Sequence, residues 1–291
     1  MSITIEQVNA QGNVVAMASG ENEAVLLTPG YSEGDRLVFR SDSAKYVSVK
    51  VHPEVNEAMV YLTAGEFDFP IPSGQALRGF KVGTFQGEQT VTMRATEEDE
   101  LKAYRNLCLN PLDYRVESEV VDPNAPEWSN PTDSKAMENG EITAFPHVYA
   151  NRVTRNEGCF YARNAIDGVA EPNGHGNYPY HSWGGAVHED LTLAVYFGRP
   201  VEVDKLVLWL RADYALEGGK EHDTFWHTAL VELSDGFKEE IKPKKSNQGQ
   251  EFNLGKHTTE WIKLSRLDPL QHEGSLNFAA LTQIELWGND K

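Results

Sequence analysis

Two loop-like stretches in the second half of the sequence hold the residue types that could do chemistry. The first is NGHGNYPYHSW (173–183), which carries His175, Tyr178, His181 and Trp183 among glycines and a proline. The second covers residues 211–226 and carries Arg211, Asp213, His222, Asp223 and Trp226. Glycine and proline are typical of surface loops, and loops on a rigid scaffold concentrate binding groups. If both loops lie at one end of a scaffold, they predict a single site.

The chemistry of this set suits a carbohydrate. Sugar hydroxyls both donate and accept hydrogen bonds, so planar guanidinium groups and carboxylates suit them. The apolar face of a sugar ring can lie on an aromatic side chain. The set therefore predicts a non-catalytic carbohydrate-binding site. Two structural interpretations stay open: Arg211 and Asp213 could form an exposed ion pair, and Trp183 and Trp226 could belong to the core.

Three other functions stay open from the residues alone. A glycosidase or lyase could use Glu217 or Asp223 with a histidine, but hydrolysis needs two carboxyl groups at a set separation. A transition metal could be bound by histidines, although no HExxH spacing occurs among His175, His181, His188, His222 and His227. The chain could also be a protein-interaction module. No phosphate-binding loop, nucleophile elbow or catalytic cysteine motif appears, so no catalytic residue is assigned.

The composition restricts the partners. The formal net charge is −18, which argues against nucleic acid and against an anionic membrane surface. No apolar run approaches the roughly 20 residues of a membrane span. The first residues show no secretory leader, so we expect a cytoplasmic protein unless a leader was removed. A protein partner or a homo-oligomer remains open. Cys108 and Cys159 stand in apolar contexts and are expected to be buried free thiols.

The elements that must position these loops are predicted to be β-strands. Residues 1–110 contain short alternating runs such as YVSVKV (46–51), separated by turn clusters such as TPGYSEGD and IPSGQ. EEDELKAY (97–104) is the best helical candidate. Residues 111–140 are rich in Pro, Asn and Ser, as in a linker, and strand patterns resume over 141–291. The pattern predicts an all-β chain of two β-sandwich or jelly-roll domains.

Residues 141–291 resemble a known family. FYARNAIDG, then YFGRPVEVDKLVLWLRAD, then a closing QIELWG are similar to the galactose-binding-like, discoidin-type β-sandwich, a fold of many carbohydrate-binding modules. RADY followed by HDTFWHTALVELSDG resembles a bacterial subgroup of two-domain carbohydrate-binding proteins. EGDRLVF, VYLTAGEFDFPIP and RNLCLNP extend this likeness to the N-terminal half. The stretch ALEGGKE (215–221) departs from the shorter loop of that subgroup. The resemblance implies a β-sandwich that binds a sugar through loops at one end.

The resemblance also implies a structural calcium ion beneath these loops. Its ligands would be the carbonyl of Arg163, the carboxylate of Asp167 and the side chain of Gln283, where the family more often has Glu. Calcium takes six to eight oxygen ligands, and an amide oxygen can be one of them. Alternatively, Asp167 forms a turn that needs no ion.

Overall fold

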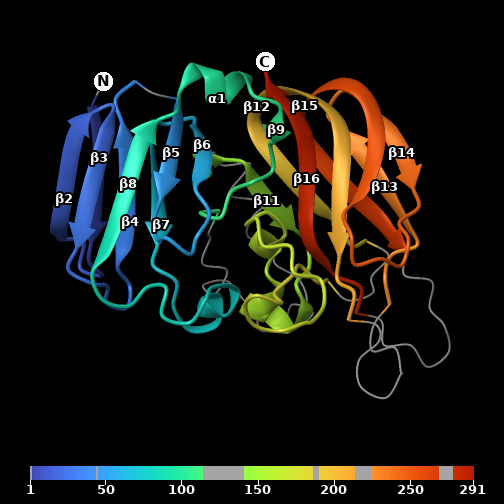
Figure 1. The fold of residues 1–291 in the computed structure, drawn as a ribbon, viewed down its shortest axis with the longest axis horizontal. Helices are drawn as coiled ribbons and strands as arrows, with labels where there is room; N and C mark the ends of the chain where they lie inside the picture. Colours follow the sequence, from blue (N-terminus) through green and yellow to red (C-terminus); the bar gives the residue numbers. More distant parts are fainter. Residues whose placement is uncertain (1, 44, 114–140, 186–189, 214–223, 269–277) are drawn as a thin grey trace.

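The computed structural model of the chain describes residues 2–43, 45–113, 141–185, 190–213, 224–268 and 278–291. Antiparallel strands make up most of the regular structure, and they form three sheets (Figure 1). Within these residues the only α-helix is α1 (Glu98–Lys102), which lies inside the range predicted from the sequence. The prediction of an all-β chain is confirmed.

In the N-terminal half, a four-stranded sheet packs against a five-stranded sheet. The first has the order β2 (Val14–Glu21), β1 (Ser2–Val8), β4 (Arg36–Ser41) and β7 (Glu66–Pro70). The second has the order β10 (Ala144–Phe145), β6 (Ala58–Leu62), β5 (Tyr46–Lys50), β8 (Gln89–Ala95) and β3 (Glu23–Thr28). Alternate residues of each strand face the shared core, as the period of two requires.

One seven-stranded sheet organises the C-terminal half. Its main path is β14 (Lys238–Ile241), β13 (Thr228–Leu233), β15 (Gln250–Asp268), β12 (Leu193–Leu210), β16 (Leu281–Asp290) and β9 (Arg105–Asn106). Strand β11 (His147–Ala150) pairs with β12 outside this path. The run LVLWL (206–210), whose continuous apolarity is typical of a strand covered on both faces, forms the end of β12 between β15 and β16.

The runs LTLAVYFG and VEVDKLVLWLRA each have the pattern of a strand, but the structure joins them in the single long strand β12. The pairing of β12 with β15 shifts register between Tyr196 and Val201, a stretch that contains Gly198 and Pro200. Gly198 has φ +67°, and a Cβ at this position would lie 2.4 Å from the ring of Phe145. Because proline has no N–H for the ladder and glycine tolerates positive φ, the ladder is interrupted here while the strand continues.

The two halves exchange strands. β9 comes before the 111–140 segment but pairs with β16, whereas β10 comes after it and pairs with β6. Asp290, near the end of β16, accepts hydrogen bonds from Arg105, Arg199 and Tyr46. Burial opposes ionisation of Asp290, but its arginine partners outweigh it and lower its pKa. The halves therefore share both backbone pairing and a charged contact.

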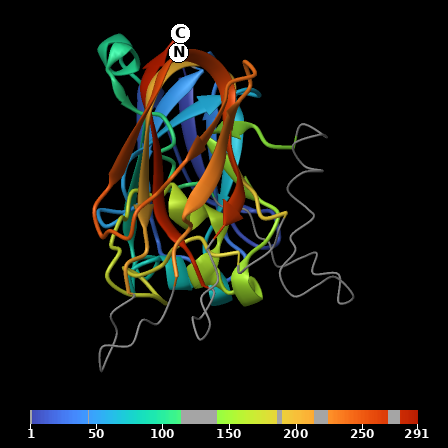
Figure 2. The ribbon, with the colours of Figure 1, turned by 90° about the vertical axis from the view of Figure 1, so that its right-hand side faces the viewer.

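Short 3-10 helices gather at the lower end of the molecule, opposite the end where β16 finishes (Figure 1, Figure 2). The N-terminal half contributes η1 (Gly74–Gly79), and the C-terminal half contributes η3 (Thr154–Asn156), η4 (Gly158–Phe160) and η5 (Ala162–Ala165). Both cysteines are buried and free, as predicted. Burial raises the pKa of the Cys159 thiol to about 11, so the thiolate form is disfavoured.

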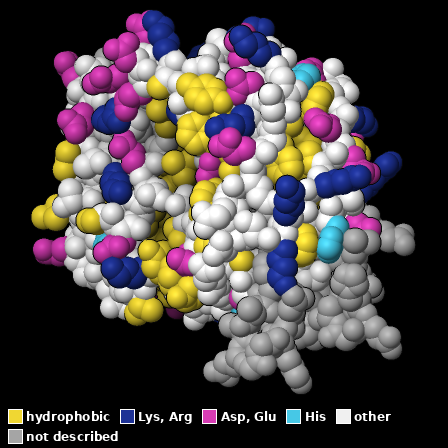
Figure 3. All heavy atoms as spheres, turned by 45° about the vertical axis from the view of Figure 1, so that its right-hand side comes forward, with side chains coloured by type: hydrophobic (Ala, Val, Ile, Leu, Met, Phe, Trp, Pro, Cys, Tyr) yellow, Lys and Arg dark blue, Asp and Glu magenta, His cyan; other side chains and the backbone are white. Residues whose placement is uncertain are grey.

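The surface carries both signs of charge. Figure 3 shows acidic and basic side chains interspersed on one face rather than gathered into a single field. In the part of the chain that the structure describes, no helix is long and apolar enough to cross a membrane. The chain segments predicted as the linker fall largely on residues 114–140, which lie outside the described ranges.

Candidate functional site

Both predicted loops begin or end at the lower end of the C-terminal sheet. The segment between β11 and β12 contains η3, η4 and η5 and continues into the first loop. The second predicted loop follows β12, whose last residue is Leu210, and precedes β13. Backbone bonds tie the two together, because the N–H of Ala212 donates to the carbonyl of Pro172 over 2.6 Å. The expectation that the loops lie at one end agrees with this arrangement.

Arg163, Asp167 and His181 form a buried group, the inner cluster. Nε2 of His181 lies 2.6 Å from Oδ2 of Asp167, and the guanidinium of Arg163 lies 3.6 Å from the same oxygen. The other carboxylate oxygen of Asp167 accepts the N–H of Val169 at 3.0 Å. The three side chains are 0–6% exposed. Since a buried carboxylate needs partners, Arg163 and His181 compensate the charge of Asp167.

The predicted calcium ligands do not fit a calcium ion in this arrangement. The carbonyl of Arg163 accepts the N–H of Ile166 at 3.0 Å, and Oε1 of Gln283 accepts the N–H of Gly168 at 3.1 Å. Both oxygens of Asp167 already have protein donors. Calcium needs six to eight oxygens, and a second cation beside the Arg163 guanidinium would be repelled. The guanidinium of Arg163 supplies, beside Asp167, the positive charge that the resemblance assigns to the calcium ion.

Arg211, Asp213 and His175 form a second group, the outer cluster. Nε of Arg211 lies 3.1 Å from Oδ1 of Asp213, and Oδ2 of Asp213 is hydrogen-bonded to Nδ1 of His175. The guanidinium of Arg211 also donates to the carbonyl of Phe278. The Arg211 and Asp213 side chains are 3% and 0% exposed, but His175 is 35% exposed. Arg211 and Asp213 do form an ion pair, the alternative left open from the sequence, but the pair is buried rather than exposed, and Asp213 holds a half-exposed histidine.

A cavity of about 180 Å³ lies beside the outer cluster. The side chains that give it its chemistry are Thr154, Arg155, Phe160, His175, Arg211 and Phe278. It therefore combines an imidazole, two guanidinium groups and two aromatic rings in a small volume. Such a mixture of convergent polar groups and apolar surface is typical of a small-ligand site.

The sequence did not single out Arg155 or Phe160. Arg155 has φ +50° and Asn156 has φ +47°, a backbone conformation that is uncommon outside glycine. This turn places the Arg155 guanidinium 5.5 Å from the centre of the Phe160 ring. The run RNEG (155–158) signals a turn, but nothing in it indicates that the turn lines a cavity.

The other predicted contacts lie elsewhere. Trp183 and Trp226 are 0% and 2% exposed, and their rings pack 5.5 Å apart in the core. Neither offers a face to a ligand, so the prediction that they contact one is corrected: they close the end of the sandwich, the alternative named from the sequence. Tyr178 stacks on His181 at 5.6 Å and belongs with the inner cluster.

Two of the predicted site residues, His222 and Asp223, lie outside the described residues, as does His188. Within the described ranges, no group of three or more His, Cys, Asp or Glu could hold a metal ion. His175 and His181 belong to different clusters, each bonded to its own aspartate.

The N-terminal half reaches the first loop directly. Nε of Arg78, in η1, donates to Oδ1 of Asn177 at 2.7 Å, and the carbonyl of Arg78 accepts the N–H of Tyr178. The Arg163 guanidinium lies 4.3 Å from the ring centre of Phe80, directly after η1. The loop is therefore fixed from both halves of the chain.

Comparisons with known proteins give likeness over about half of the chain. No protein-family model matches it, and no curated protein sequence matches it. Among solved structures, it is similar to the family 32 carbohydrate-binding module of C. perfringens NanJ in complex with galactose. The identity is 18% over 48% of this chain and 91% of that one, with a TM-score of 0.34.

Two other solved structures give the same picture. A Streptococcus pneumoniae fucose-binding module, SpX-3, is 14% identical over 48% of this chain and 92% of that one, with a TM-score of 0.34. A Clostridium perfringens family 32 module in complex with GalNAc-β-1,3-galactose is 15% identical over 48% and 92%, with a TM-score of 0.35. These modules are of the kind that the sequence resembles. At such values, the likeness does not say what this chain binds.

Proposed function

We propose that the chain is a non-catalytic carbohydrate-binding protein that holds a sugar in the cavity beside the outer cluster. The observation that carries this proposal is the half-exposed imidazole of His175, bonded to a fully buried carboxylate at the cavity wall. The cavity, of about 180 Å³, has room for a single small ring.

The cavity groups match the needs of a polyhydroxylated ring. Asp213 is held by Arg211, so the orientation of His175 is fixed before a ligand arrives. Preorganised polar groups lose little conformational entropy on binding, which favours affinity. Arg155 adds a planar donor with a side chain that is 48% exposed, and Phe160 and Phe278 add apolar surface. Planar donors beside apolar surface suit hydroxyl groups and ring C–H faces together.

A binding role suits the outer cluster better than hydrolysis does. Glycosidases need two carboxyl groups across the scissile bond, one of them free to transfer a proton. Asp213 is instead ion-paired with Arg211 and hydrogen-bonded to His175, which favours a fixed carboxylate that orients its neighbour. The surplus of acidic residues in the chain favours neutral ligands over anionic ones.

The test is an array of neutral mono- and oligosaccharides, followed by calorimetric titration of the sugars that bind. Micromolar to millimolar dissociation constants, about −8 to −4 kcal/mol, are the expected range. His175→Ala and Arg155→Ala should each weaken binding by about 10- to 100-fold, since a hydrogen bond with a charged group contributes about 1.5–3 kcal/mol. Melting temperatures should stay near that of the wild type.

The matched controls are His257→Ala and Arg36→Ala. His257 is also bonded to an aspartate, Asp235, at 2.7 Å, but Asp235 follows the far end of β13. Arg36 pairs with Asp68 in the N-terminal half. Both controls should bind sugar as the wild type does. Absence of binding to every sugar up to tens of millimolar, with the fold intact, would sink the proposal. Release of new reducing ends from a bound oligosaccharide would show that the protein is an enzyme and would overturn the non-catalytic part of the proposal.

A further inference from the structure

A second and larger cavity lies in the N-terminal half, at the lower end of the molecule. Its volume is about 400 Å³, against about 180 Å³ for the cavity beside the outer cluster. Three segments line it: the turn at 31–33, the segment 71–77 that leads into η1, and the loop 81–86. The sequence marks the first two only as turn clusters that separate strands.

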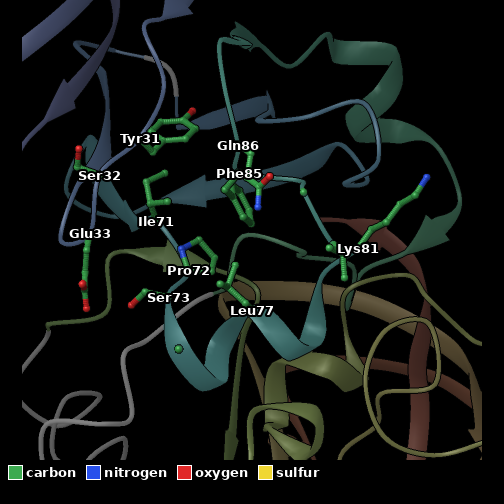
Figure 4. Close-up of a pocket in the computed structure, with 13 residues that line it drawn as sticks. Tyr31, Ser32, Glu33, Ile71, Pro72, Ser73, Leu77, Lys81, Phe85 and Gln86 are labelled. Carbon is green, nitrogen blue, oxygen red and sulfur yellow. The ribbon is translucent and has the colours of Figure 1, made fainter.

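The lining has an apolar floor and a polar rim. Figure 4 shows Tyr31, Ile71 and Phe85 side by side along this hollow. The rings of Tyr31 and Phe85 meet edge to face with centres 6.4 Å apart. The rim is made by exposed side chains that carry hydroxyl, amide or carboxylate groups: Ser32, Glu33, Ser73 and Gln86.

The charge of the rim disfavours an anionic occupant. The nearby cation, Lys81, points outward in Figure 4, and its ammonium group is bonded to Glu54 at 2.7 Å. Glu33 leaves a carboxylate on the rim itself. An apolar floor with a rim of hydroxyl and amide groups suits a neutral ring that bears hydroxyl groups.

Two apolar side chains stand exposed at the edge of this cavity. Leu77, on η1, is 44% exposed, and Val82, in the loop, is 97% exposed. Single exposed apolar residues are ordinary on a protein surface. Here both lie on the lining of one cavity, so they enlarge its apolar floor towards solvent.

The helix η1 connects this cavity to the other one. Leu77 lines the N-terminal cavity, while the next residue, Arg78, bonds to Glu157 at 2.8 Å. Glu157 also pairs with Arg155, which lines the cavity of the outer cluster. Beside this chain of contacts, the N–H of Gly158 donates to the side chain of Gln75. The two cavities therefore flank a shared ridge of short helices.

We propose that the N-terminal cavity is a second subsite for a neutral oligosaccharide whose chain crosses η1 and whose other end occupies the cavity beside the outer cluster. This inference rests on the proposed function. Once one end of a ligand is bound at one subsite, its other end has a high effective concentration at the second subsite. A ligand long enough to reach both subsites therefore binds more tightly than a short one, although the contacts within each subsite are the same. The ion pair of Arg78 with Glu157 and its hydrogen bond to Asn177 join η1 to the C-terminal half, which favours a fixed spacing of the two subsites.

The experiment compares ligand lengths. The probes are the monosaccharides and the di-, tetra- and hexasaccharides of three neutral β-linked series: galactan, cellulose and chitin. Wild-type protein should bind the hexasaccharide of at least one series about 10-fold or more tightly than its monosaccharide. The double variant Leu77→Asp, Val82→Asp should lose this gain and keep the monosaccharide affinity of the wild type. His175→Ala should weaken every length.

The matched control is Met17→Asp, Val25→Asp, which places two charges on exposed apolar positions of β2 and β3. It should keep the full gain with length. Affinity that does not change with length, or a Leu77/Val82 variant that keeps the gain, overturns the second subsite while leaving the proposed function in place. A wild-type protein that binds no member of any series overturns the second subsite, and the proposed function falls with it only if the whole array of neutral sugars also shows no binding.

Discussion

The inner and outer clusters contain the same three residue types but differ in exposure. Each joins one aspartate, one arginine and one histidine at the loop end of the same sheet. In the inner cluster all three side chains are 0–6% exposed. In the outer cluster the aspartate and arginine are as deeply buried, but the histidine is 35% exposed. Residue types alone therefore do not separate a fully buried ion cluster from one with a side chain available to a ligand, because the two clusters differ in the exposure of one imidazole.

What covers each cluster explains the difference. The N-terminal half covers the inner cluster: Phe80 lies under the Arg163 guanidinium, and Asn56 donates to the carbonyl of Asp167 at 3.0 Å. His181 is further covered by the ring of Tyr178. The histidine of the outer cluster, His175, instead borders the 180 Å³ cavity. The inner cluster thus lies at the junction between the halves, whereas in the outer cluster only His175 faces solvent.

The largest expected effect is the loss of the buried aspartate from the inner cluster. Asp167→Ala leaves the Arg163 guanidinium without its carboxylate in a buried site, and breaking a buried pair costs about 3–5 kcal/mol. Chemical denaturation should therefore show a large fall in the free energy of unfolding. Asp235→Ala, which breaks the more exposed pair with His257, should cost less than about 1 kcal/mol. Equal losses in the two variants would contradict the assigned burial.

The two histidines should separate stability from binding. His181→Ala removes the buried partner of Asp167, and an unsatisfied buried group costs about 1–3 kcal/mol. His175→Ala also removes a partner of a buried aspartate, Asp213, but water from the adjoining cavity can replace the imidazole there, so its effect on unfolding should be smaller than that of His181→Ala. Thermal melts of the two variants, with sugar titrations beside them, make this comparison. If His175→Ala is the more destabilising of the two, the roles of the clusters are reversed.

A buried carboxylate, Glu232, that is paired with two more exposed lysines provides a smaller effect. Hydrogen bonds from Lys238 and Lys263 lower the pKa of Glu232 to about 2, from its ordinary 4.5. A lowered pKa means that the stabilisation is present above about pH 4.5 and is lost as the pH falls towards about 2. Glu232→Gln should reduce the free energy of unfolding at pH 7 by about 1 kcal/mol or less. Denaturation of both proteins across pH 2–7 should show the difference closing in acid.

The smallest expected effect is that of metal removal. Arg163 supplies a positive charge beside Asp167, so a chelator should leave the melting temperature unchanged, and added calcium should do the same. A bound ion at 100 times its dissociation constant would contribute about 2.7 kcal/mol, a readily measured shift. A fall in melting temperature on chelation, reversed by calcium, would mean that the donors rearrange around an ion after all.

Most of the strand framework could be predicted from the sequence, since alternation in runs such as YVSVKV and continuous apolarity in LVLWL follow from burial on one or two faces. The residue types near the candidate site, namely histidine, arginine, aspartate and aromatic residues, could also be predicted. The burial of individual side chains could not be predicted. In the sequence, Trp183 and Trp226 are candidates to stack on a sugar ring, but long-range packing buries them in the core. The resemblance implied that Arg163 would bind an ion through its carbonyl oxygen. In the structure, its guanidinium instead pairs with Asp167, four residues later, and this contact depends on the local backbone conformation, which the residue types do not reveal.

The exchange of β9 and β10 also has a consequence for a severed chain. A cut within residues 114–140 would leave β9 on the first fragment, although it completes the sheet of the second. The second fragment would keep β10, whose partner β6 is on the first. Each fragment would thus expose an unpaired strand edge that only the other can satisfy. The two fragments should therefore behave as a complementing pair that reassembles on mixing, rather than as two independent domains.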